Sequence, residues 1–103
     1  MSVVVVAVIT PLDGHLQDVV DAFTVASPNV HAEAGCELYA LHHDADHVIM
    51  IERWTTAADL AAHSTGAPID QLNALLVGHV TGPAEVSVLE NVPLGDPAKG
   101  TIH

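Results

Sequence analysis

Hydrophobic and polar positions along the chain follow two periods, one typical of strands and the other typical of helices. The run Val3–Thr10 is continuous and rich in β-branched residues, which predicts a strand buried on both faces. A turn follows, and the next apolar positions then have helical spacing, at Leu16, Val19, Val20 and Phe23. The chain is therefore expected to begin with a strand and an amphipathic helix.

The end of this first helix has two interpretations. Ser27-Pro28 could terminate it, because proline cannot continue the hydrogen-bond ladder of a helix interior. Alternatively, the pair could be an N-cap and a first helical residue, so that the helix continues through a kink to about Ala34. In either case Gly35 is expected to close the segment.

A hairpin is predicted next, with strands at Cys36–His43 and His47–Thr55 and a loop at Asp44-Ala45-Asp46. The second strand is apolar on both faces over residues 48–51. Helices can cover one face, and the other needs a second cover, for which the sheet of a partner chain is the simplest. The pattern therefore predicts a sheet-to-sheet homodimer.

The remainder of the domain contains two short helices and a last strand. Thr56 and Asp59 have the spacing of a capping pair that opens a helix to about Ser64. A second helix is expected to begin at Pro68 with its leucines turned inward, at Leu72, Leu75 and Leu76. Alternation over Glu85–Val92 predicts the last strand.

The order of these elements predicts the fold class. Strand, helix, two strands, two helices and a strand form an α+β, ferredoxin-like split βαβ arrangement, with an antiparallel sheet and helices on one face. Residues 1–92 are expected to form this single domain. Residues 93–103 contain Gly, Pro and Lys with little to pack, and are expected to form an extended C-terminal tail.

Composition narrows the kinds of partner that the protein can bind. Arg53 and Lys99 stand against 13 acidic residues, for a formal net charge of −11. Such a surface repels phosphate backbones and anionic lipid, so we expect neither nucleic-acid nor membrane binding. Cys36 is the single cysteine, which excludes an internal disulfide. The N-terminal apolar run is too short to span a membrane and lacks the preceding positive charge of a signal peptide, which favours a cytoplasmic location.

The best candidate for a chemical site is the junction within Val48–His63, where a strand runs into a helix. Glu52 and Trp54 lie on one face of the strand, and the helix returns His63 toward the apolar side. A carboxylate, an indole and an imidazole therefore gather at one place. The residues 42–47 around the hairpin loop include metal-ligand types, but alternation directs neighbouring histidines to opposite faces, so no metal site is expected there.

Four short segments of the chain carry a resemblance to a known family. They are Glu33-Ala34-Gly35-Cys36, Tyr39 with Leu41-His42, the strand segment Val48–Trp54, and Leu60-Ala61-Ala62-His63. In this order and spacing, the segments resemble the antibiotic biosynthesis monooxygenase family, which includes quinol monooxygenases. The resemblance covers roughly residues 3–92.

This resemblance implies a fold and a chemistry. Members of the family are dimeric α+β barrels with a pocket between helices and sheet, and several oxidise quinols or anthrone-like polyketides with molecular oxygen, without metal or flavin. The expected function is thus a cofactor-independent monooxygenase acting on a quinol or polyphenolic substrate. The expected partners are a small aromatic molecule, oxygen and a second copy of the chain. The alternatives are an isomerase of a small carbonyl compound and a non-catalytic dimer that binds an aromatic ligand.

Within that chemistry, His63 is expected to act as the base, because imidazole titrates near working pH. Glu52 is expected to orient His63 or to take the proton itself if burial raises its pKa. Trp54 and Tyr39 are expected to wall in the ring. Tyr39 and His42 point to opposite faces of one strand, so at most one of them shares a given pocket.

The chain also departs from the family pattern. Residues 65–69 stand where members often carry a His-Phe or similar pair, so a pocket-lining group is missing or replaced. The haem-degrading branch has an Asn on the first strand and a Trp in place of His63, and this chain has neither, so no haem is expected. Quinol-oxidising relatives have counterparts of Pro28, which favours continuation of the first helix.

Overall fold

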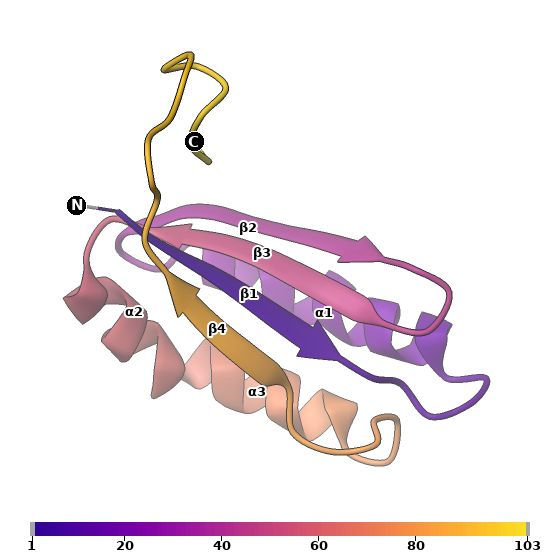
Figure 1. Ribbon diagram of the computed structural model, residues 1–103. Helices are drawn as coiled ribbons and strands as arrows, with labels where there is room; N and C mark the ends of the chain where they lie inside the picture. The colour runs from indigo at the N-terminus through magenta and orange to yellow at the C-terminus, as the bar shows by residue number, and fades with distance from the viewer. Residues whose placement is uncertain (1, 103) are drawn as a thin grey trace.

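The valine-rich strand β1 (Val3–Ile9) occupies a central position in a four-stranded antiparallel sheet. In the computed structural model, which describes residues 2–102, the strand order is β2-β3-β1-β4. The other strands are β2 (Cys36–His43), β3 (Val48–Trp54) and β4 (Glu85–Leu89). All three helices lie on one face of this sheet (Figure 1), namely α1 (Leu16–His31), α2 (Ala57–Ser64) and α3 (Ala67–Leu76). The predicted α+β, ferredoxin-like fold is confirmed.

Strand register decides which side chains meet on the helix-covered face. Glu52 of β3 lies opposite Val5 of β1 on one side and opposite Tyr39 of β2 on the other. Because alternate residues of a strand share a face, Trp54 lies on the same side as Glu52. The aliphatic core on this face therefore surrounds a carboxylate and a phenol.

Helix α1 runs through Pro28 without interruption and ends at His31. The residues that it buries keep helical spacing throughout, at Val19, Ala22, Phe23, Ala26 and Val30. Pro28 lies on the exposed side of the helix, where water can satisfy the carbonyl that loses its intrahelical partner. Continuation through the proline, the interpretation favoured by the resemblance, is confirmed, although the helix stops before Ala34.

Helix α2 begins where the sequence predicts it, and α3 begins at Ala67, one residue before the predicted start at Pro68. Thr56 caps α2 by accepting a hydrogen bond from the backbone N–H of Asp59 at 3.1 Å. In α3, Leu72 and Leu76 are buried, but Leu75 is 38% exposed, so its predicted inward position is wrong. Residues four apart share a helix face more closely than residues three apart, and the buried stripe of α3, which packs mainly against α1, excludes Leu75. None of the helices in residues 2–102 has the length and hydropathy needed to cross a membrane.

Beyond β4, which ends at Leu89 rather than at Val92, the chain leaves the sheet and projects away from the helix layer (Figure 1). It turns at Asp96, whose carboxylate accepts from the N–H of Ala98 at 2.8 Å. It then returns toward β3, where Arg53 Nη1 donates to the carbonyl of Ile102 at 3.1 Å. The predicted boundary between a domain and an extended tail stays a prediction.

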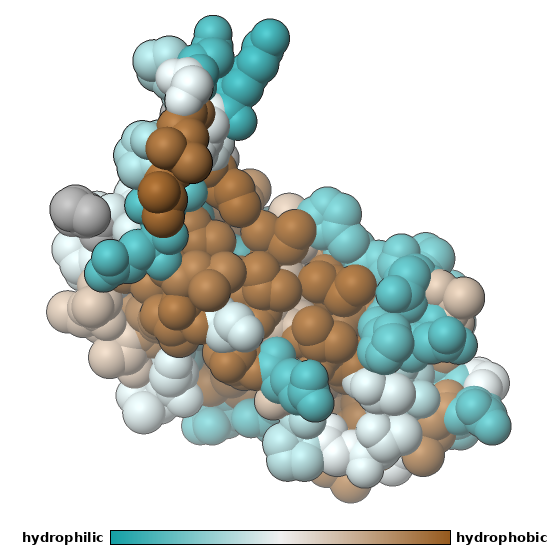
Figure 2. Space-filling view, in the orientation of Figure 1, coloured by the Kyte–Doolittle hydropathy of each residue, from teal (hydrophilic) through white to brown (hydrophobic). Residues whose placement is uncertain are grey.

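The face of the sheet opposite the helices is apolar and uncovered. Figure 2 shows hydrophobic side chains spread across it and along the start of the projecting segment. Its central residues are only partly buried, at Val6, Val8, Ile49 and Ile51. Leu89, Val92 and Leu94 extend this surface, with exposed fractions of 44, 70 and 73%.

Candidate active site

A cavity of about 460 Å³ lies between the helix layer and the sheet. Its wall is mostly aliphatic, with contributions from every layer, including Val5 and Ile9 of β1, Phe23 of α1, Met50 of β3 and Leu72 of α3. The polar residues of the wall are Tyr39, Glu52, His63, Ser64 and Asn73. A cavity of roughly 300–1,000 Å³ with a few converging polar groups is the usual form of a small-molecule site.

His63, near the end of α2, is the imidazole that faces this cavity. The Thr56 cap fixes where α2 begins, and this places His63 on the inner face, where it is only 5% exposed. Its Nδ1 lies 2.7 Å from Oε1 of Glu33. Because an ionised carboxylate only accepts hydrogen bonds, Nδ1 carries a proton, and in the neutral imidazole Nε2 is then the atom with the lone pair. The geometry therefore leaves Nε2 as the basic atom of the site.

Glu33 was not assigned a role from the sequence, although it lies in one of the family-like segments. It stands in the turn between α1 and β2, which continues through Gly35 with a φ of +77°. A Cβ at Gly66 would lie 3.3 Å from the second Glu33 oxygen, so the glycine permits this close approach. The sequence signal for Glu33 is a carboxylate two residues before Gly35, in the turn that leads into the strand paired with β3.

Trp54 lies behind the imidazole and is not part of the cavity wall. It is 0% exposed, and its ring stacks on that of His63 with centroids 4.5 Å apart and an interplanar angle of 27°. Its Nε1 donates to Oε1 of Glu52 at 2.9 Å. Trp54 thus holds both the histidine ring and the carboxylate in place, and it does not have the position in the cavity wall that the sequence predicts.

Burial raises the pKa of Glu52 above its ordinary value of 4.5, and the negative charge of Glu33 adds to this effect. The hydrogen bond from Trp54 and the nearby His63 oppose it. Glu52 Oε1 lies 3.9 Å from His63 Nε2, which is too long for a direct hydrogen bond. A substrate oxygen between the two atoms could contact both of them.

Arg53, the residue after Glu52, points to the other face of the sheet. It pairs with Glu37 at 2.6 Å and not with Glu52.

Replacing Glu52 by glutamine is expected to remove a decline of stability with rising pH. The raised pKa means that the folded state binds more protons than the unfolded chain above pH 4.5, so the free energy of unfolding falls as pH rises through that window. Glu52→Gln abolishes this titration, while its amide oxygen can still accept from Trp54. Urea unfolding at several pH values should therefore show a flatter profile and a relatively more stable variant at neutral pH. Glu85→Gln, on exposed β4, should keep the wild-type profile; equal profiles for Glu52→Gln and wild type would contradict the prediction.

Tyr39 and His42 separate as their alternation predicts. Tyr39 lines the cavity, and its ring meets that of His63 in an edge contact at 5.9 Å. Burial, followed by the charges of Glu52 and Glu33, raises the pKa of its phenol well above the usual range. His42 lies exposed on the opposite face and bonds the carbonyl of Ala40 at 3.1 Å. The structure therefore brings together Glu52, His63, Trp54 and Tyr39, and leaves His42 apart.

Around the hairpin loop, His47 Nδ1 pairs with Asp44 at 3.2 Å. Their side chains are 40 and 58% exposed, and they belong to no set of three converging ligands among residues 2–102. The thiol of Cys36 is only partly exposed, and burial, ahead of the charges of Glu33 and Glu52, raises its pKa. A raised pKa lowers the fraction of reactive thiolate.

The chain is similar to one known protein family and to several solved structures. The family model described as antibiotic biosynthesis monooxygenase matches residues 2–74. Among solved structures, Rv0793 from Mycobacterium tuberculosis is similar with a TM-score of 0.79 and 23% identity, over 93% of this chain and 98% of that one. PA3566 from Pseudomonas aeruginosa gives 0.78 and 24%, over 88 and 94% of the two chains.

A structure named antibiotic biosynthesis monooxygenase gives a TM-score of 0.79 and 22% identity, over 88% of this chain and 99% of that one. At these identities the structural likenesses bear on the fold alone. None of the curated protein sequences matches the chain significantly.

Proposed function

The chain belongs to the antibiotic biosynthesis monooxygenase family, and on that basis we propose that it is a cofactor-independent monooxygenase. Its substrate is a quinol or a polyphenolic, polyketide-type molecule, and its oxidant is molecular oxygen. The observation that carries the proposal is the His63–Glu33 pair, 2.7 Å apart, at the wall of an apolar cavity. A buried imidazole whose proton is fixed on Nδ1 presents Nε2 as a base toward the bound ring.

The reaction starts with removal of a proton from the aromatic substrate. His63 Nε2 takes this proton, and the charge of Glu33 stabilises the imidazolium that forms. The electron-rich anion then passes an electron to oxygen, and the resulting radical pair combines to a peroxide. Loss of the second hydrogen from the peroxide-bearing carbon breaks the O–O bond and leaves one oxygen atom in the product as a carbonyl. The other oxygen atom leaves as water, with the proton that His63 returns. The aliphatic wall shelters these intermediates from solvent.

Glu52 and Tyr39 supply the remaining polar groups near the substrate. Because burial raises the pKa of Glu52, this carboxyl can exchange a proton with the substrate oxygen nearer to neutral pH than an exposed one can. Tyr39 keeps its proton and forms part of the wall against which the ring rests. Trp54 supports this arrangement from behind, through its stacking on His63 and its hydrogen bond to Glu52.

The test of this function is oxygen uptake with a panel of reduced quinones and anthrones, run against a buffer blank because quinols autoxidise. Acceleration above the blank, unchanged by a chelator and with labelled oxygen in the product, is the expected result. No acceleration across the panel would contradict the proposal. Tight binding of the same compounds without turnover would instead favour a ligand-binding dimer.

We also propose that two copies of the chain pair through the apolar, uncovered face of the sheet. Ile51 lies near the middle of this face, between Val6 of β1 and Ala40 of β2. Light scattering at micromolar concentration should therefore give twice the chain mass of 10.7 kDa. Ile51→Glu is expected to yield monomers, because it would bury a charge in the interface.

The matched control for this prediction is Val25→Glu, which introduces the same charge at a position of α1 that is 51% exposed. It should remain a dimer. A monomeric wild-type protein would contradict the proposed pairing. The cytoplasmic location stays a prediction of the sequence.

A further inference from the structure

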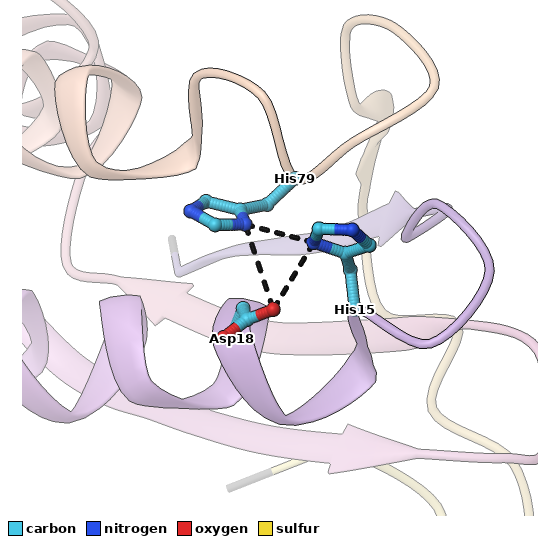
Figure 3. A group of neighbouring side chains, drawn as sticks. All are labelled: His15, Asp18 and His79. Carbon is cyan, nitrogen blue, oxygen red and sulfur yellow. Dashed lines mark hydrogen bonds and ion pairs between the residues drawn. The ribbon is translucent and has the colours of Figure 1, made fainter.

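A second cluster of chemically competent side chains lies outside this cavity, in His15, Asp18 and His79. His15 precedes α1, Asp18 lies in the first turn of α1, and His79 lies in the loop after α3 (Figure 3). The cluster stands near the C-terminal end of β1, whereas Glu52 and Trp54 pair with its N-terminal half. Among residues 2–102 it is the one group of three potential ligands whose atoms all lie within 4.8 Å of one another.

Three ligand atoms of this cluster point toward a common centre (Figure 3). His15 Nδ1 lies 2.9 Å from His79 Nδ1 and 3.0 Å from Asp18 Oδ2, and His79 Nδ1 lies 3.6 Å from the same oxygen. With Zn–N and Zn–O bonds of about 2.0–2.1 Å, a tetrahedral zinc ion separates its ligand atoms by about 3.3 Å. The triangle of side chains therefore already has the size of one face of a zinc coordination shell. We propose that His15, Asp18 and His79 bind a divalent transition-metal ion, with Zn²⁺ as the best fit.

The two imidazoles meet through the same atoms that would bind the metal ion. Two Nδ1 atoms at 2.9 Å can hydrogen-bond only if one ring carries a proton on Nδ1 and the other does not. A metal ion at the centre replaces that proton, and both rings then bind through Nδ1 with their protons on Nε2. The three side chains are 35, 47 and 36% exposed in chain order, so water can fill the remaining coordination position.

Backbone hydrogen bonds hold the two loops that carry the ligands together. The N–H of Leu12 donates to the carbonyl of His79 at 2.9 Å, and the N–H of Thr81 donates to the carbonyl of Thr10 at 2.9 Å. Gly78, with a φ of +82°, makes the turn that leads from α3 to His79. Because the ligands are positioned before the ion arrives, binding orders little additional chain.

The ligand types select the class of ion. Two imidazoles and one carboxylate suit zinc, nickel and copper, and they disfavour calcium and magnesium, which prefer oxygen ligands alone. The net charge of −11 raises the local concentration of any divalent cation near the surface.

A metal ion here would fasten the start of α1 to the loop after α3. The neighbours of His79 in that loop, Val77 and Val80, line the cavity described above. The site lies outside the cavity and holds no group assigned to the oxidation, so bound zinc is expected to stabilise the fold and to leave the chemical step to His63.

The test is a calorimetric titration of the untagged, metal-stripped chain with zinc chloride. One ion per chain is expected to bind. His79→Gln and Asp18→Asn should each weaken binding by at least the roughly 10- to 100-fold that even loss of a supporting group costs. His47→Gln is the matched control, because it removes the exposed histidine of the Asp44 pair and should keep wild-type affinity.

Thermal unfolding provides the second measurement. Zinc at about 100 times the wild-type dissociation constant should raise the Tm of the wild type by on the order of 10 °C, and should raise the Tm of His79→Gln by clearly less. Should His79→Gln fail to fold, Asp18→Asn serves in its place, because it keeps both rings and loses only the charge. Absence of saturable zinc binding, or equal affinity in wild type and both variants, would overturn the proposal.

Discussion

Replacing His63 by alanine is expected to lower kcat/KM for oxidation of a quinol by about 100- to 10,000-fold, the usual worth of a general base. The loss follows from the geometry, because His63 Nε2 is the one basic nitrogen that the described residues present to the cavity. Oxygen uptake at saturating and subsaturating substrate would separate kcat from KM. Binding of the aromatic ring should survive, since the aliphatic wall is untouched.

Two matched variants give this prediction its controls. His42→Ala removes an imidazole from the opposite face and should retain wild-type turnover. Glu33→Gln keeps a hydrogen-bond acceptor for His63 Nδ1 but loses the charge that stabilises the imidazolium, so it should lower kcat and shift the pH profile of turnover. Wild-type turnover in His63→Ala, with circular dichroism showing an intact fold, would remove the assignment of His63 as the base.

Replacing Trp54 by alanine is expected to cost about 3–5 kcal/mol of the free energy of unfolding, the usual range for deleting a buried aromatic side chain. Trp54 is completely buried, stacks on His63 and donates the hydrogen bond that satisfies Glu52. The substitution therefore leaves a cavity and a buried carboxylate without its donor. Because Trp54 is the only tryptophan, urea unfolding should be followed by circular dichroism rather than by fluorescence.

Trp54→Phe separates the two contributions. It keeps an aromatic ring against His63 and loses the Nε1–H, so about 1–3 kcal/mol of the loss should remain, the cost of an unsatisfied buried group. The hydrogen bond from Trp54 lowers the pKa of Glu52, and its removal should raise that pKa further. A loss below about 1 kcal/mol for Trp54→Ala would contradict the packing role.

Periodicity alone predicts which face of a strand or helix a side chain lies on, because this depends only on its position along that strand or helix. Alternation along β3 correctly placed Glu52 and Trp54 on one face, and alternation along β2 separated Tyr39 from His42. Alternation specifies the face of the sheet on which a side chain lies, but not how deeply the side chain is buried there. It therefore could not show that Trp54 lies behind His63 rather than in the wall of the cavity. The inward position predicted for Leu75 failed for a similar reason, because the width of the buried stripe depends on the helix that packs against it.

Periodicity could not predict contacts between side chains that lie far apart in the sequence. Glu33 meets His63 across 30 residues, and His15 meets His79 across 64. Each contact depends on the lengths and paths of several loops, which hydrophobic spacing does not determine. The resemblance to a family drew attention to the segment that contains Glu33, yet assigning its role required the hydrogen bond itself.

The cavity is assembled from two parts of the chain, and only the first of them falls within the match to the family model. The groups proposed for chemistry lie within residues 2–74, the span that matches the family model, whereas one side of the wall comes from residues 76–86, beyond that span. An insertion, deletion or side-chain exchange at Gly82, Pro83 or Ala84 would resize the cavity without moving the His63–Glu33 pair. Substitutions in this short loop would therefore change which molecules fit the cavity while leaving the proposed base and its partner in place.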